Sequence, residues 1–342
     1  MNRKLNVAIA GYGWAATAHI PAINATRRAQ VVAIYSSRPQ DAALLSAQYG
    51  CAMRTTTDFA ELLCDPTIDV VDITSIPGRH KELFLAAVAA GKHVIVEKPV
   101  AMHLADGEAM LVAAKQRGVR TCVCFEARFC NHFQVTQALL GQGLLGDLHY
   151  GEVDYYHGIG PWYGQFRWNI TKADGGSALL SAGCHALDAL LFFLGTDVAE
   201  VSTYHTRSRS PIFAPYEYPT SSVTILKFKS GRVGKCAAIV DCLQPYYCHL
   251  HLVGSEGSLL DNKLHSMKLK TDKQRWSNLA MQMLDSGDVK DHPYQAQFDA
   301  FFQAVAEGRE MPLTSLPEAM NTFRVLFAAE QSAATGKPVR LD

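Results

Sequence analysis

The sequence has no excess of either charge, because 32 Lys and Arg residues balance 32 Asp and Glu residues among its 342 residues. A chain without net charge has no overall field to attract nucleic-acid phosphates or an anionic membrane surface. It also lacks an apolar run of about 18 residues, the length at which a membrane-spanning helix is suspected. We therefore expect neither a nucleic-acid partner nor a membrane partner.

The nine cysteines are irregularly spaced and odd in number, so they do not predict a disulfide framework. Cys122, Cys124 and Cys130 lack the Cys-x-x-Cys spacing of zinc sites. His249 and His251 alternate along a predicted strand, which we interpret as sheet patterning. We predict that the protein has no metal site, keeps its thiols reduced and is cytoplasmic.

Short apolar runs alternate with helix-like stretches over residues 5–125, which indicates repeated βαβ units. The runs are rich in Val and Ile on both faces, as expected of parallel strands buried between helices. The predicted strands span residues 7–10, 31–35, 70–74, 93–96 and 121–125. The predicted helices between them include residues 39–49, 81–90 and 104–117.

The pattern changes after residue 125, where alternating segments indicate a half-exposed antiparallel sheet. These segments span residues 149–155, 222–228 and 233–240. Helices are predicted at residues 133–140, 294–307 and 316–335. We therefore predict an α/β protein with a doubly wound, parallel Rossmann domain over residues 1–125 and an α+β domain over residues 126–342. Two domains also suit the chain length.

Residues 7–16 read as a strand that runs into Gly-x-Gly-x-x-Ala at the start of a helix, which is a dinucleotide fingerprint. Gly11 permits the tight turn, Gly13 lets the backbone approach a pyrophosphate, and Ala16 allows close helix packing. The helix N-terminus then offers amides to the phosphates. The motif alone also fits an ordinary turn, but the βα units that follow it favour a dinucleotide.

No acid ends the second predicted strand, which continues as Tyr35-Ser36-Ser37-Arg38. An NAD-binding fold usually places Asp or Glu here against the ribose hydroxyl. Two hydroxyls and a guanidinium suit a 2′-phosphate instead, so NADP is favoured over NAD. The alternative is that these residues only begin the next helix, with Ser37 as its cap.

Glu97-Lys98-Pro99 follows the strand at residues 93–96, at the sheet edge where such folds bind ligands. Proline disfavours the helical conformation of the residue before it, so we expect Lys98 in a loop. Oxidation of an alcohol needs a group that takes the hydroxyl proton, and lysine suits this task. The alternative is a simple surface lysine.

A second cluster lies in residues 175–188, where Ser181, His185 and Asp188 are spaced to share one helix face. Burial of these polar groups is costly without partners, whereas a substrate cleft would satisfy all three. The alternative is a core histidine that hydrogen-bonds to Asp188.

Together these motifs resemble the Gfo/Idh/MocA family of glucose–fructose oxidoreductase and inositol dehydrogenase relatives, over essentially the whole chain. The matching features are Gly11, Gly13 and Ala16 with His19-Ile20-Pro21 after them, Glu97-Lys98-Pro99, Arg128 within residues 125–129, Gly175-Gly176, Gly183-x-His185-x-x-Asp188 and residues 336–339.

The resemblance implies an NAD(P)-dependent oxidoreductase that acts on a CH–OH group of a sugar, polyol or related cyclic compound. It assigns proton transfer to Lys98 and His185. It also implies a large, mostly antiparallel C-terminal sheet that is often used for oligomer contacts, so we expect a homodimer or homotetramer. Many relatives carry an acid where this chain has Ser181. Either Asp188 substitutes for that acid, or Lys98 and His185 act without it, or the chemistry is altered.

Two other functions stay open at this point: a redox-neutral glycosidase with tightly bound NAD(H), and a non-catalytic dinucleotide sensor. The predicted cofactor-binding residues are Gly11, Tyr12, Gly13, Trp14, Ala15, Ser36, Ser37, Arg38, Thr74, Ser75, Ile76, His80, Glu97 and Lys98. The predicted substrate-binding residues are Lys98, Arg128, Tyr156, His157, Trp162, Trp168, Lys172, Ser181, His185 and Asp188.

Overall fold

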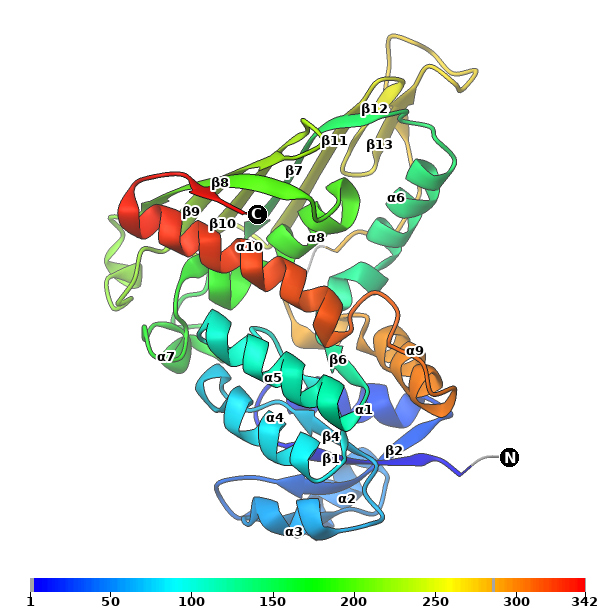
Figure 1. Cartoon of the computed structure of the whole chain (residues 1–342), viewed down its shortest axis with the longest axis vertical. Coiled ribbons are helices and arrows are strands. Elements are labelled where there is room, and N and C mark those ends of the chain that lie inside the picture. Colours follow the sequence, from blue (N-terminus) through cyan, green and yellow to red (C-terminus); the bar gives the residue numbers. More distant parts are fainter. Residues whose placement is uncertain (1–2, 285–286, 342) are drawn as a thin grey trace. The chain divides into compact units, whose positions relative to one another are not determined.

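The computed structural model describes residues 3–284 and 287–341 and is shown in Figure 1. It divides into two compact units: unit 1 is Met1–Glu126 with Asp288–Met320, and unit 2 is Ala127–Gly287 with Asn321–Asp342. The sequence analysis assigned residues 288–320 to the second domain, whereas here they belong to unit 1. The physical reason is aromatic packing, because the His19 ring lies 4.4 Å from the ring of Tyr294 and 4.9 Å from that of Phe298.

Unit 1 contains a six-stranded, wholly parallel sheet in the order β3-β2-β1-β4-β5-β6. This confirms the predicted doubly wound sheet. Its strands are β1 (Leu5–Ala10), β2 (Ala29–Tyr35), β3 (Arg54–Thr56), β4 (Val70–Ile73), β5 (His93–Val96) and β6 (Thr121–Val123). Its helices are α1 (Ala16–Ala25), α2 (Ala42–Tyr49), α3 (Phe59–Cys64), α4 (His80–Ala89), α5 (Leu104–Arg117) and α9 (Tyr294–Ala306), with short turns η1 (Pro77–Arg79) and η5 (Val289–Asp291).

Unit 2 contains a nine-stranded sheet in the order β14-β13-β12-β11-β7-β10-β9-β8-β15. All neighbours are antiparallel except β7 and β10, which confirms the mostly antiparallel sheet. Its strands are β7 (Leu148–Tyr156), β8 (Val198–Thr206), β9 (Ser221–Phe228), β10 (Val233–Ile239), β11 (Tyr247–Gly254), β12 (Gly257–Leu260), β13 (Lys263–Ser266), β14 (Ser277–Asn278) and β15 (Val339–Arg340).

The helices of unit 2 are α6 (Asn131–Gly141), α7 (Phe166–Asn169) and α8 (Cys184–Leu194), with the turn η4 (Pro211–Phe213). A π-helical turn, η3 (Leu179–Gly183), leads into α8. The turn η2 (Glu126–Phe129) and helix α10 (Leu316–Thr335) cross the boundaries between the units.

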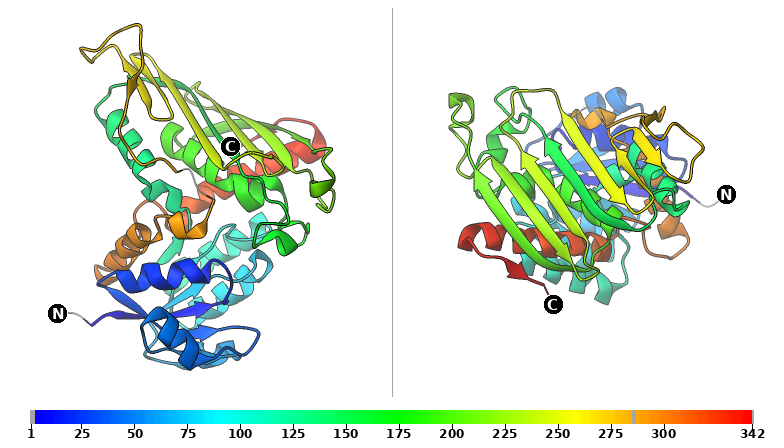
Figure 2. Two further views of the ribbon diagram at one scale, coloured as in Figure 1. Left: turned by 180° about the vertical axis from the view of Figure 1, so that it is seen from behind. Right: turned by 90° about the horizontal axis from the view of Figure 1, so that it is seen from above.

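Helix α8 packs on one face of the unit 2 sheet, over β7 and β10 (Figure 2). Gly183 permits this approach, since a Cβ built there would lie 2.2 Å from Cβ of Ala238. The opposite face, called here the outward face, carries partly exposed side chains such as Tyr204, Val223 and Ile225. Within the described residues, the structure contains no helix that is both long and apolar enough to span a membrane.

Candidate functional site

The glycine-rich loop of unit 1 connects β1 to α1. Gly11 has a φ of +114°, and a Cβ there would lie 2.7 Å from the Ser75 backbone nitrogen, so only glycine fits. Thr74 fixes the loop, because its hydroxyl donates to the Gly11 carbonyl at 2.6 Å. Gly13 faces open space, since a Cβ there would meet nothing within 4 Å.

The first turn of α1 has no side-chain cap and no acidic residue. Uncapped amides at a helix N-terminus attract phosphate. The residues of this loop therefore fit a dinucleotide pyrophosphate. The predicted contacts Tyr12, Trp14 and Ala15 lie in the same loop, and the Tyr12 hydroxyl lies 3.1 Å from that of Tyr49 on α2.

The segment after β2 does not begin a helix. Asp41 caps α2 by accepting from the amides of Ala43 and Leu44, so Ser37 is not the cap. Ser36 is buried, while Ser37 and Arg38 are exposed. Two hydroxyls and a guanidinium thus lie at the carboxyl edge of the sheet, where a parallel sheet binds an adenosine ribose.

His80 holds together two of the predicted cofactor-binding segments. Its Nδ1 lies 2.8 Å from the Pro99 carbonyl oxygen and its Nε2 lies 3.0 Å from that of Ser75. The ring is completely buried, and this burial lowers the pKa of His80. His80 therefore positions the loops after β4 and β5, while Ile76 is exposed at the same edge.

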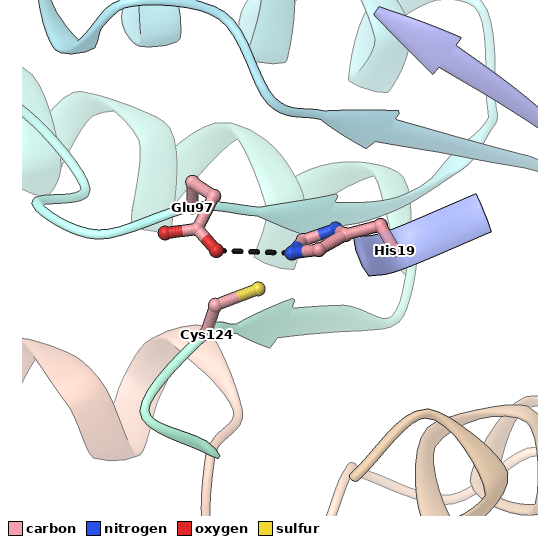
Figure 3. Close-up of side chains that lie close together, drawn as sticks. All are labelled: His19, Glu97 and Cys124. Carbon is pink, nitrogen blue, oxygen red and sulfur yellow. Dashed lines mark hydrogen bonds and ion pairs between the residues drawn. The ribbon is translucent and has the colours of Figure 1, made fainter. Parts of the chain in front are cut away.

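Glu97 is the centre of a buried hydrogen-bonded network directly before Lys98 (Figure 3). Its Oε1 lies 3.0 Å from Nε2 of His19 and accepts from the Tyr294 hydroxyl at 2.9 Å. Its Oε2 accepts from the Lys98 backbone amide at 3.1 Å. The other His19 nitrogen lies 2.9 Å from Asp72 Oδ2. The loop that carries Lys98 is thus anchored to α1, β4 and α9.

The electrostatics of this network favour charged groups. Burial opposes protonation of His19, but Asp72 and Glu97 raise its pKa to about 10. Burial would raise the pKa of Glu97, yet the His19 hydrogen bond and the Lys98 charge lower it. Nearby Glu126 differs, because burial and the Glu97 charge raise its pKa. The network therefore contains an imidazolium beside a carboxylate.

Figure 3 also shows Cys124, whose sulfur lies with His19 and Glu97 in a possible metal-ligand arrangement. Burial and neighbouring negative charges raise the pKa of the Cys124 thiol well above its ordinary value. A protonated imidazole also has no lone pair for a metal. The chemistry of these three groups therefore favours a charge network.

In unit 2, His185 is the second residue of α8, directly after the π-helical turn that contains Ser181. The predicted single helical face is therefore interrupted by a π turn, a feature common at functional sites. Ser181, His185 and Asp188 are all buried. The ring of His185 stacks on that of Tyr155, with 6.0 Å between centroids.

Asp188 does not orient His185 in the way the sequence analysis considered. Its Oδ2 and Oδ1 accept hydrogen bonds from Nε and Nη2 of Arg128, both at 2.7 Å. Oδ1 also accepts a hydrogen bond from the Thr322 hydroxyl at 2.8 Å. Arg128 and Asp188 were expected to bind substrate, but each is 2% exposed and they pair with each other. Such a bidentate buried pair fixes α8 to the segment before α6.

Tyr156 differs from expectation because it lies on the outward face. Its ring stacks on that of Tyr247, at 6.1 Å, whereas Tyr155 and His157 lie on the side of His185. The Tyr155 hydroxyl is 3.2 Å from Nδ1 of His157. Successive strand residues face opposite ways, so one position separates a site residue from a surface residue.

The remaining predicted substrate residues occupy the segment between β7 and η3. Trp162 is 61% exposed and its indole donates to the Gly158 carbonyl at 3.0 Å. Trp168 lies half-buried on α7, and Lys172 is exposed.

Sequence reasoning missed His19, Asp72 and Tyr155, and it gave Tyr294 only as a weaker candidate for substrate contact. His19 had been noted only as part of a motif, and Asp72 was an acid inside an apolar strand, which was an available signal. Tyr294 was regarded as a helix start, and nothing local linked it to Glu97, which lies far away in sequence. Tyr155 was one position from the residue that was chosen.

The fold and loop geometry define a two-unit protein with a dinucleotide-binding Rossmann fold. Residues 5–125 match the model of the oxidoreductase family with an NAD-binding Rossmann fold, and residues 133–260 match the Gfo/Idh/MocA C-terminal domain. The chain therefore belongs to the Gfo/Idh/MocA oxidoreductase family. This confirms the resemblance inferred from the motifs.

Three similar proteins illustrate the range of relatives. The chain is 27% identical over 327 residues to 1,5-anhydro-D-fructose reductase of Ensifer adhaerens, covering 94% of each chain. It is 33% identical over 193 residues to an uncharacterised oxidoreductase of Synechocystis sp., covering 56% of this chain and 52% of that protein. The structure of levoglucosan dehydrogenase with NADH and levoglucosan shares the fold, with a TM-score of 0.84, 23% identity and coverage of 99% and 100%.

Proposed function

We propose that this protein is an NAD(P)-dependent dehydrogenase or reductase that acts on a CH–OH group of a sugar, polyol or related cyclic compound. One observation carries the proposal: Lys98 follows a carboxylate that is fixed by His19 and Tyr294 at the carboxyl edge of the Rossmann sheet. The names of the similar reductase and dehydrogenase support a sugar-like substrate.

In this proposal Lys98 and His185 handle the substrate proton. A bound nicotinamide would supply the hydride acceptor or donor. During oxidation Lys98 acts from its deprotonated form, whose neutral amine takes the hydroxyl proton as the carbon gives up a hydride, and reduction reverses both steps from the ammonium form. We assign to His185 the role of holding or receiving a substrate proton, and Tyr155 and His157 provide polar aromatic surface beside its ring.

We favour NADP over NAD as the cofactor. Arg38 is exposed after β2, Ser36 and Ser37 precede it, and no carboxylate occupies the ribose position. A 2′-phosphate would accept charge-assisted hydrogen bonds from these groups. Gly13 and the start of α1 would hold the pyrophosphate.

We further propose that the protein forms a homodimer or homotetramer through the outward face of unit 2, and that it acts in the cytoplasm. Tyr204 is 72% exposed and Ile225 is 40% exposed on that face. Apolar side chains at such levels of exposure gain free energy when a second sheet covers them.

The experiment is a fluorescence titration with NAD, NADH, NADP and NADPH, followed by a panel of sugars and polyols monitored at the nicotinamide absorbance. Tight NADP(H) binding and a net change in nicotinamide on one compound class would support the proposal. Turnover of a glycoside without net nicotinamide change would replace it with the redox-neutral glycosidase. Tight cofactor binding with no reaction would replace it with the sensor.

A further inference from the structure

Two histidines and a glutamate converge on one point of the outward face of unit 2. His249 and His251 lie two positions apart on β11, so their imidazoles point to the same side. Glu152 lies on the adjacent strand β7, directly opposite His251. His-x-His on one strand with a carboxylate from its neighbour is a donor set that divalent zinc prefers.

The distances fit a small ion. Oε1 of Glu152 lies 2.9 Å from Nε2 of His249 and 3.9 Å from Nδ1 of His251. Zinc bonds of about 2.0–2.1 Å place tetrahedral ligands about 3.3 Å apart, so the two distances bracket that value. All three ligand atoms lie within 4.8 Å of one another. Small rotamer changes would therefore complete the triad.

The groups around the triad orient it for metal binding. Nδ1 of His249 lies 3.3 Å from Oδ1 of Asp261, which leaves Nε2 as the ligand atom. The second Glu152 oxygen accepts from the Tyr150 hydroxyl at 2.7 Å. A carboxylate behind a ligating histidine fixes its tautomer and increases its basicity.

The surroundings also let an ion enter. The His249, Glu152 and His251 side chains are 16%, 19% and 29% exposed, unlike the buried network at Glu97. Lys235 is the nearby cation, at 3.6 Å from Oε2 of Glu152, but it lies 2.5 Å from Asp154, which balances its charge. Tyr247 donates to the outer oxygen of Asp261 at 2.6 Å.

We propose that Glu152, His249 and His251 bind one Zn²⁺ ion on the outward face of unit 2, with Asp261 as the carboxylate behind His249. The fourth position of the ion takes water. The site joins β7 to β11 and is independent of the proposed hydride transfer. The sequence analysis predicted no metal because the histidines alternate, yet that alternation is what aligns their rings.

Proton competition gives the site a pH dependence. Zinc binds unprotonated imidazole nitrogens, so protons compete with the ion for His249 and His251. Zinc affinity is therefore expected to fall as the solution is acidified. Binding that is unchanged from alkaline to mildly acidic pH would contradict ligation by His249.

The test uses the full chain with any histidine tag removed and with metals stripped by a chelator. Calorimetric titration with zinc chloride should give one ion per chain. His251→Gln and Glu152→Gln should abolish this binding, and Asp261→Asn should weaken it by about 10- to 100-fold. His149→Gln is the matched control, because His149 is an exposed histidine on β7, the strand that carries Glu152. This variant should leave zinc binding unchanged.

Cobalt substitution gives a readout that does not depend on the variants. Co²⁺ in wild-type protein should show the visible bands of a tetrahedral ion and no thiolate-to-cobalt band, because the site has no cysteine. A thiolate band would assign binding to the cysteines and overturn the proposal. Absence of zinc binding, or equal binding by wild type and Glu152→Gln, would overturn it too.

Discussion

At the scale of single residues, His19 is the buried cation on which the Lys98 loop depends. Both of its nitrogens face carboxylates, and its side chain has no exposure. Removal of one partner from a buried ion pair leaves the other uncompensated, which costs about 3–5 kcal/mol. His19 is therefore expected to affect both folding and the position of Lys98.

His19→Gln should lower the free energy of unfolding by about 3–5 kcal/mol, measured by urea denaturation near neutral pH. His93→Gln is the control, because His93 is half-buried on β5 and its Nδ1 accepts a hydrogen bond from the Arg120 amide. That control should cost about 1 kcal/mol. Equal losses of unfolding free energy in the two variants would show that the carboxylates around His19 add no stability beyond that of an ordinary buried hydrogen bond.

The same residue predicts a pH dependence. The pKa of His19 is about 10 in the folded chain and 6.5 in the unfolded chain. Its contribution is therefore complete below 6.5 and is lost as pH rises through about 10. Stability measured by urea denaturation should fall over this window in wild type and fall less in His19→Gln. Parallel curves for the two proteins would contradict a charged His19.

Arg38 is the second residue with a direct test. Arg38→Asp should weaken NADP(H) binding by about 10- to 100-fold and leave NAD(H) binding nearly unchanged, because only the 2′-phosphate loses charge-assisted hydrogen bonds. The measurement is fluorescence titration of all four nucleotides. Arg27→Asp, an exposed arginine elsewhere in unit 1, serves as control. Equal loss of both cofactor types would remove the case for phosphate recognition.

At the scale of elements, the π turn and α8 depend on a close approach to β10. A methyl group at Gly183 would overlap Cβ of Ala238 at 2.2 Å. Helix and strand would have to separate, and this would move Ser181 and His185 together. Gly183 in the Gly-x-His motif is thus required by packing.

Gly183→Ala should destabilise the protein by about 1–3 kcal/mol through overpacking, measured by thermal or urea unfolding. Gly141→Ala is the matched control, since a Cβ at this end of α6 meets nothing within 4 Å. The control should be neutral or slightly stabilising. Unchanged stability of Gly183→Ala would contradict the need for a close approach between residue 183 and Ala238 on β10.

The elements that sequence analysis predicted were those with a strong periodic signal. β1, β4 and β5 are buried on both faces, so their Val and Ile runs were visible. β3 was missed because Arg54–Thr56 is three residues long and carries no apolar run. The buried pairing of Arg128 with Asp188 was missed because the partners are 60 residues apart and no local pattern joins them.

At the scale of the whole molecule, the outward face of unit 2 carries a row of side chains across four strands. Ile225 pairs with Lys235, Lys235 with Glu152, and Glu152 with His251. Apolar residues lie at one end of this row and the proposed zinc ligands at the other. The face therefore combines a surface suited to self-association with a polar site.

Ile225→Glu should shift the proposed oligomer toward monomer, because it places a charge within the apolar part of that face. The measurement is sedimentation velocity or light scattering at several protein concentrations. Leu44→Glu is the control, since Leu44 is 64% exposed on α2 of unit 1. An oligomer that resists Ile225→Glu would place the interface elsewhere.

The division of the chain into two units could be predicted only in part from the sequence. The change of pattern near residue 125 was visible, but the return of residues 288–320 to unit 1 was not. That return depends on aromatic contacts between α1 and α9, and on the Tyr294 hydrogen bond to Glu97. Such long-range contacts leave no periodic trace in the sequence.

The most direct test of the proposed function is single-turnover hydride transfer in Lys98→Met, with the substrate found in the sugar and polyol panel. The account predicts that the variant binds the cofactor like wild type but transfers hydride about 10²–10⁴-fold more slowly, because no amine takes the hydroxyl proton. Hydride transfer at the wild-type rate in Lys98→Met would contradict it.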